Sequence, residues 1–127
     1  MLYIVESSRT IDEIGEAIRE AAQKRKFGVL HVHNLKATMA KKGVEFAADC
    51  RIFEVCNPQQ AKRVLESRME VSTALPCRIS VYEEDGKVKL ATIKPSMMLE
   101  MFGAEDLGPV AEEVEKVMFE IMDEAAG

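Results

Sequence analysis

Two cysteines have the sequence context that most favours chemistry. Cys56 lies directly before Asn57 and Pro58, a pair typical of a helix start, and Cys77 follows Pro76. The unpaired backbone N–H groups at a helix start favour a thiolate, the form of cysteine that attacks electrophiles and binds metals. A cysteine at a strand end is also often plain core. The sequence therefore predicts a reactive thiol at Cys56, with core packing as the alternative.

Cys77 is the candidate partner of Cys56. Apolar residues alternate over 77–82, which puts Cys77 on the inward face of a strand. If the strand that ends at Cys56 lies beside it, the two thiols could share a ligand, a sulfur atom, a disulfide or a metal. Helix starts also bind anions. We therefore expect a ligand-binding site made of Cys56, Asn57, Pro58 and Cys77, with Cys56 as the nucleophile if the site performs thiol chemistry.

The other metal-ligating side chains form weaker patterns. His31 and His33 are spaced to share one face of a strand and could bind zinc or copper together with a cysteine. Two polar residues on the solvent face of a strand need no ligand, and nothing near Cys50 suggests chemistry. We therefore predict no metal site and no cofactor.

A methionine-rich turn follows the last predicted strand. Met97, Met98 and Met101 could form a thioether site, a flexible lid over a pocket or a dimer contact. Methionine is a common gap filler, so core packing is the main expectation for this turn.

Composition limits the classes of function. The chain has 127 residues, a net charge of -5 and a pI near 5.1. We expect a single domain over residues 1–127, and the acidic balance argues against nucleic-acid binding. No catalytic triad order, phosphate-binding loop or paired-cysteine zinc motif is present, so an enzyme is the weaker expectation. An odd cysteine count without a signal peptide or membrane span predicts a cytoplasmic protein.

Hydrophobic periodicity predicts an α+β fold with the order β-α-β-β-α-β-β-α. A capping box at Thr10 starts the first helix, Asn57 with Gln60 forms a second capping box, and Ser96 caps a short turn. The hairpin signal is at 84–86. Over 29–33 we expect Leu30 and Val32 on the inner face of a strand. The predicted strands lie at 2–6, 29–33, 51–55, 77–82 and 87–91, and the main helices begin at 10, 57 and 109. A short helix is expected over 35–39.

Several motifs in this order resemble one family. They are Leu35-Lys36-Ala37-Thr38-Met39, Lys42-Gly43-Val44, Cys56-Asn57-Pro58 followed by Ala61, and Leu75-Pro76-Cys77 before Val81-Tyr82-Glu83 and Asp85-Gly86. The chain resembles the proteins called domain of unknown function 302 over nearly its whole length. The resemblance implies a TBP-like curved antiparallel sheet packed against helices, a homodimer and no established activity. Fold kinship with the TATA-binding protein does not imply DNA binding.

These observations favour a dimeric, non-enzymatic module that binds a small anionic or sulfur-containing ligand around Cys56 and Cys77. Three alternatives stay open at this point. The protein could carry out sulfur transfer or redox chemistry with Cys56 as nucleophile, it could bind a soft metal, or its cysteines could be structural while the dimer surface carries the function.

Overall fold

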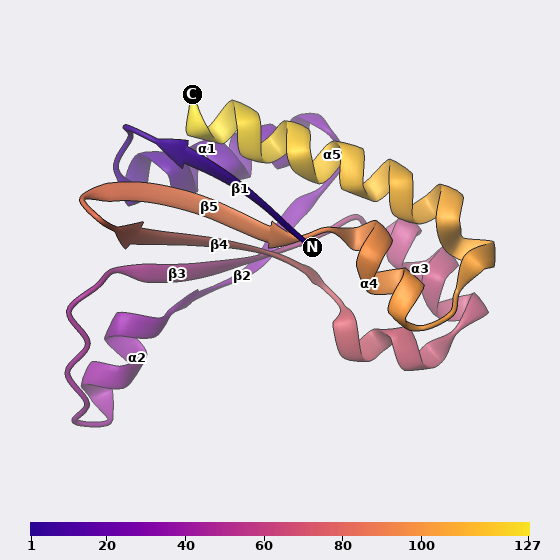
Figure 1. Ribbon diagram of the computed structural model, residues 1–127, viewed down its shortest axis with the longest axis horizontal. Coiled ribbons are helices and arrows are strands. Elements are labelled where there is room, and N and C mark those ends of the chain that lie inside the picture. Colours follow the sequence, from indigo (N-terminus) through magenta and orange to yellow (C-terminus); the bar gives the residue numbers. More distant parts are fainter.

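A computed structural model describes residues 1–127 and consists of one curved, five-stranded antiparallel sheet with five α-helices (Figure 1). Two short 3₁₀ helices cover Met69–Ala74 and Glu105–Leu107. The strands are β1 (Leu2–Ser7), β2 (Gly28–Asn34), β3 (Cys50–Cys56), β4 (Cys77–Glu84) and β5 (Lys87–Ile93), in the sheet order β1-β5-β4-β3-β2. The helices are α1 (Ile11–Lys24), α2 (Leu35–Lys41), α3 (Pro58–Ser67), α4 (Pro95–Met101) and α5 (Gly108–Ala126). The predicted α+β class is confirmed. The short helix α2 agrees with the helix expected over 35–39, and α4 is a short addition to the predicted order. None of the helices combines the length and hydropathy that a membrane span requires.

Most of the predicted helix caps and turns are found at the predicted residues. The capping box at Thr10 is formed, and the β4–β5 hairpin turns at Asp85 and Gly86, which both have positive φ. Leu30 was expected on the inner face, but a bulge between Val29 and His31 shifts the register and leaves Leu30 61% exposed. The short helix α4 begins at Pro95 after Lys94, so the predicted cap at Ser96 is wrong.

The helices α1 and α5 pack side by side on one face of the sheet and enclose the main core (Figure 1). Its fully buried side chains include Ile14, Ile18, Ile79, Leu90, Met118 and Ile121. Gly15 gives α1 its close approach, because a Cβ built there would lie 3.1 Å from Cζ of Phe53 on β3. A glycine inside a helix, normally unfavourable, therefore has a packing reason here.

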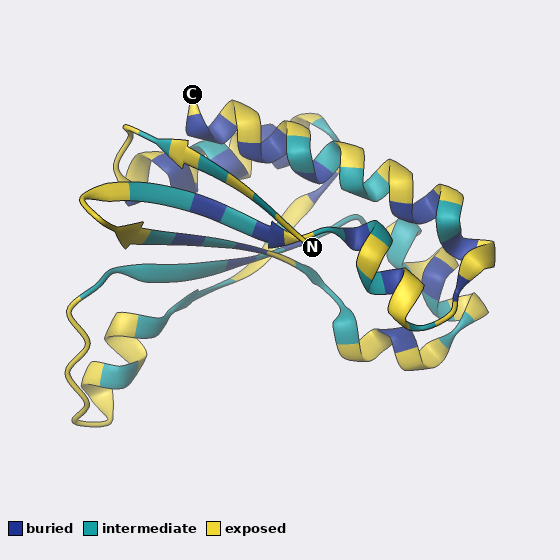
Figure 2. Cartoon of the chain, in the orientation of Figure 1, coloured by how far each residue is buried: buried dark blue, intermediate teal, exposed yellow.

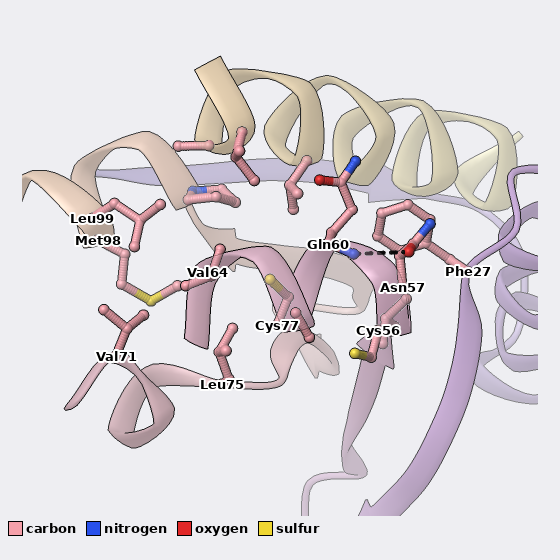
Figure 3. Close-up of a pocket in the computed structure, with 16 residues that line it drawn as sticks. Phe27, Cys56, Asn57, Gln60, Val64, Val71, Leu75, Cys77, Met98 and Leu99 are labelled. Carbon is pink, nitrogen blue, oxygen red and sulfur yellow. Dashed lines mark hydrogen bonds between the residues drawn. The ribbon is translucent and has the colours of Figure 1, made fainter. Parts of the chain in front are cut away.

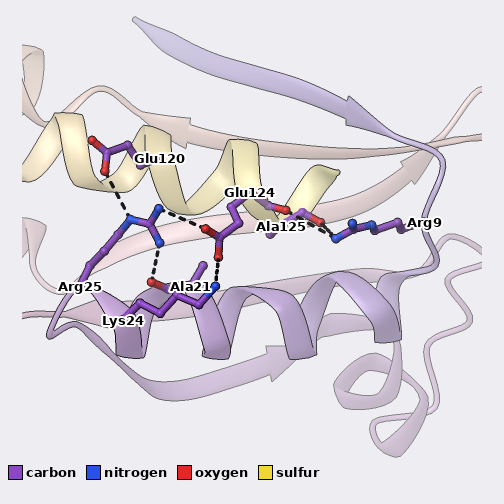
Figure 4. Close-up of polar contacts among 7 residues, drawn as sticks. All are labelled: Arg9, Ala21, Lys24, Arg25, Glu120, Glu124 and Ala125. Carbon is purple, nitrogen blue, oxygen red and sulfur yellow. Dashed lines mark hydrogen bonds and ion pairs between the residues drawn. The ribbon is translucent and has the colours of Figure 1, made fainter.

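A polar clamp fixes α5 along α1 (Figure 4). Arg25 donates to the carbonyl of Ala21 at 2.9 Å and to carboxylate oxygens of Glu120 and Glu124 at 3.3 and 3.2 Å. At the far end of α5, Arg9 donates to the carbonyl of Ala125 at 3.1 Å. These bonds satisfy carbonyl groups at the ends of both helices and hold α5 over the sheet.

The opposite face of the sheet carries no helix over β1 and β5. Leu2, Ile4 and Ile93 of this face are between 45% and 52% exposed. The edge strand β1 accordingly has exposed residues along its length (Figure 2). The fold is a two-layer structure with one open sheet face.

A second, smaller apolar cluster lies where α3 and α4 meet the N-terminal half of α5. Its buried members are Val64, Val71, Leu99, Ala104, Leu107, Val110 and Ala111. The cluster lies next to the ends of β3 and β4 at which Cys56 and Cys77 occur. The candidate site lies between this cluster and the sheet.

Candidate functional site

The two cysteines lie on neighbouring strand ends. Cys56 is the last residue of β3 and Cys77 the first of β4, and Val55 is the direct cross-strand partner of Cys77. Cys56 lies one position past the cross-strand partner of Cys77, and because successive side chains of a strand alternate in direction, the two sulfur atoms point in different directions (Figure 3). Both are free thiols.

One pocket joins both thiols to the small apolar cluster (Figure 3). It has a volume of about 50 Å³, and 13 of its 16 lining residues are hydrophobic. The lining consists of Phe27, Val55, Cys56, Asn57, Gln60, Ala61, Val64, Val71, Leu75, Cys77, Pro95, Met98, Leu99, Val110, Ala111 and Val114. Among these residues only Asn57 and Gln60 have side-chain oxygen or nitrogen atoms, and none is charged. The pocket therefore suits a neutral, apolar molecule.

All backbone N–H groups in the first turn of α3 already form hydrogen bonds to Asn57. Asn57 Oδ1 accepts from the backbone N–H groups of Gln59 at 3.0 Å and Gln60 at 3.1 Å, and the Asn57 carbonyl accepts from Ala61 at 3.0 Å. Pro58 has no N–H. No unpaired N–H of the first turn is therefore left to stabilise an anion or a thiolate. The sequence-based predictions of an anionic ligand and of a Cys56 thiolate both assumed such free groups.

The electrostatics of the thiols follow from burial. Burial raises the pKa of Cys56 above its ordinary value. Burial, helped by the neighbouring Cys56, raises the pKa of Cys77 to about 11. The prediction that the helix start favours a Cys56 thiolate is therefore wrong, because an apolar pocket disfavours the charged form and Asn57 occupies the N–H groups.

The predicted site residues are only partly brought together. Cys56, Asn57 and Cys77 line the pocket, whereas Pro58 begins α3 on its exposed side. Met98 lines the pocket and also a neighbouring hollow of about 300 Å³ that contains Cys77 and Arg78. Met98 and Cys77 thus form the wall between the two spaces.

The remaining candidates lie away from this pocket. Cys50 Sγ is 3.9 Å from Ser80 Oγ, and His33 Nε2 is 3.4 Å from a carboxylate oxygen of Glu54. The rings of His31 and His33 meet edge to face at 4.4 Å. No group of three or more histidine, cysteine, aspartate or glutamate side chains is placed to hold a metal ion.

Sequence reasoning missed Gln60 as a lining residue. It assigned this side chain to a capping box with Asn57, but Gln60 makes no such bond. Its Oε1 is instead buried without a hydrogen-bond partner, the only side-chain oxygen or nitrogen of the chain in that state. The α5 residues of the lining were also missed, because their apolar spacing predicts only core packing.

A family model and a solved structure that resemble the chain both point to the same protein family. The model of the family described as domain of unknown function DUF302 matches residues 3–125. An uncharacterised conserved DUF302 protein from Bacillus stearothermophilus has a crystal structure that is similar at a TM-score of 0.92 and 34% sequence identity. The similarity covers 98% of this chain and 97% of that one. No curated protein matches the chain.

Proposed function

We propose that this chain, which belongs to the DUF302 family, is a non-enzymatic module that binds a small, neutral, largely apolar molecule in the pocket beside Cys56 and Cys77. The observation that carries the proposal is the lining, which is apolar apart from two carboxamide side chains. The volume of about 50 Å³ is about a third of the roughly 150 Å³ cavity that binds benzene, so the pocket holds only a few non-hydrogen atoms as it stands. A five-membered ring enters when the flexible side chain of Met98 moves toward the neighbouring hollow of about 300 Å³.

The proposal narrows the ligand class that the sequence favoured. An anion would enter a pocket without a positive charge and face a helix start whose N–H groups are already bonded. Burying an unpaired charge in such a place is strongly unfavourable. A sulfur-containing or otherwise polarisable ligand fits better, since Cys56, Cys77 and Met98 are all lining residues.

Thiol chemistry receives less support than binding. A nucleophilic cysteine needs an accessible thiolate, and the raised pKa values of Cys56 and Cys77 keep both protonated at neutral pH. No basic side chain lines the pocket to reverse this effect. We therefore assign the two thiols to the binding surface of the pocket.

We also propose that the protein forms a homodimer in the cytoplasm. Leu2, Ile4 and Ile93 on the open sheet face supply apolar surface for a second copy, and three free thiols suit a reducing compartment. Sedimentation velocity tests the assembly. An Ile4→Glu variant is expected to shift the protein toward the monomer, and a wild-type chain that sediments only at its monomer mass of 14.2 kDa would contradict the dimer.

Thiophene tests the binding proposal, because it is a small, neutral, sulfur-containing ring. With ¹³C-methyl methionine labelling, we expect the Met98 methyl signal to shift on titration, while that of Met69, which is 70% exposed and lies outside the pocket, stays in place. We expect a dissociation constant on the order of 1 mM for so small a ligand.

Two variants on α5 provide the matched comparison. Ala111→Leu fills the pocket and is expected to abolish the Met98 shift, whereas Glu112→Leu adds the same side chain at an exposed neighbouring position and is expected to retain it. Unchanged thiophene binding by Ala111→Leu, or no Met98 shift in the wild type, would overturn the proposal.

A further inference from the structure

The Gln60 side chain is in an energetically unfavourable position that nothing else in the fold explains. Its Oε1 is buried and accepts no hydrogen bond. Leaving a buried acceptor unpaired costs the desolvation energy of that group without any compensating bond. Buried polar atoms of native proteins are nearly always satisfied, so an exception calls for a missing partner.

No donor group of the chain forms a hydrogen bond with Gln60 Oε1. Gln60 projects from α3 toward α5 (Figure 3), where the lining residues are Val110, Ala111 and Val114. These side chains are aliphatic. Asn57, the one other carboxamide of the lining, accepts two backbone N–H groups of α3 with its Oδ1, and its Nδ2 makes no hydrogen bond to Gln60 Oε1. The missing donor must therefore come from outside the chain.

A buried water is a poor candidate for this donor. Buried waters usually make about three hydrogen bonds, and an apolar cavity wall offers them too few partners. Gln60 Oε1 would be the only strong partner in this part of the pocket. A molecule with one donor and an apolar body matches both the single acceptor and the aliphatic wall.

A charged donor is also a poor match. An ammonium group would lose its hydration and find no carboxylate, since no acidic side chain lines the pocket. A neutral N–H or O–H group has a much smaller desolvation cost.

We propose that the ligand of this pocket carries a single neutral N–H or O–H donor, which binds Gln60 Oε1 while the rest of the molecule contacts the apolar wall. Gln60 is then the specificity-determining residue of the site. This inference rests on the proposed function, because it assumes that the pocket binds a small molecule.

Pyrrole and thiophene form a matched pair of probes, because both are five-membered aromatic rings and only pyrrole has an N–H donor. The variant Gln60→Met keeps the side-chain length and removes the carboxamide. We expect the wild-type protein to prefer pyrrole over thiophene, measured as the ratio of their dissociation constants, about tenfold more strongly than this variant does. Thiophene should bind the two proteins within about twofold of each other. The Met98 methyl signal reports binding of both probes.

A second measurement on the wild-type protein does not depend on the variant. The Gln60 carboxamide ¹³C signal is expected to shift with pyrrole and to stay in place with thiophene at equal occupancy. The role of Gln60 would be overturned if the ratio of the two dissociation constants were the same in both proteins and the carboxamide signal did not shift. The pocket proposal would then remain intact. Failure of both probes to move Met98 would overturn the pocket proposal itself.

Discussion

Replacing Gly15 by leucine is expected to lower the free energy of unfolding by about 3 kcal/mol. The added side chain would begin 3.1 Å from Cζ and 3.4 Å from Cε2 of Phe53, which is itself buried in the main core. Neither α1 nor β3 can yield easily, because Ile14 and Ile18 of α1 and Val55 of β3 are fully buried. Urea denaturation with a constant m-value measures the loss.

Two control variants separate the packing clash from helix propensity. Gly15→Ala is expected to be nearly neutral, since the helix propensity that alanine gains, about 1 kcal/mol, offsets the crowding of its methyl group against Phe53. Glu16→Leu adds a leucine at an exposed position of the same helix and is expected to change stability little. In the Gly15→Leu background, Phe53→Leu should recover part of the loss. A Gly15→Leu protein as stable as Glu16→Leu would contradict the close packing of α1 on β3.

Alkaline pH is expected to destabilise the protein through Cys77. Its pKa is about 11 in the folded state and 9.0 without the fold, so between these values the folded state holds a proton that the unfolded chain releases. This contribution to stability is complete below pH 9 and is lost as the pH rises through 11. At 1.4 kcal/mol per unit, we expect the free energy of unfolding to fall by about 2 kcal/mol over this range.

The comparison is made between the wild type and Cys77→Ala by urea denaturation at both ends of that pH range. Cys77→Ala should lose about 2 kcal/mol less than the wild type on going to the higher pH. Val81→Ala is the matched control, because Val81 is a fully buried β4 residue without an ionisable group. Its destabilisation should be equal at both pH values. Identical pH dependence in the wild type and Cys77→Ala would contradict the buried, protonated thiol.

The sequence predicted most of the fold because its signals are local. Alternating residues in β4 and β5, the capping box at Thr10 and the Asp85-Gly86 turn each act within a few positions of the chain. Leu30 shows the limit of this reasoning. Its apolar side chain fits an inward position, but the bulge in β2 arises from pairing with β3, which no local pattern shows.

The candidate site was only partly predictable for the same reason. The residues around Cys56 and Asn57 follow from a local helix-start motif, whereas the wall of the pocket comes from α4 and α5, distant in sequence. The thiolate prediction treated the N–H groups as free and the site as solvated, but Asn57 binds two of them and the pocket is apolar. Gln60 fits the sequence pattern of a capping residue, but its Oε1 is buried in the pocket without a hydrogen-bond partner.

A crystal structure under xenon pressure tests the central claim most directly, because xenon enters apolar cavities and makes no hydrogen bonds. We expect a xenon atom in the pocket among Val64, Cys77 and Val110, and none there in Ala111→Leu. A wild-type pocket that excludes xenon, or that holds a chain of hydrogen-bonded waters in its place, would contradict an apolar ligand-binding site.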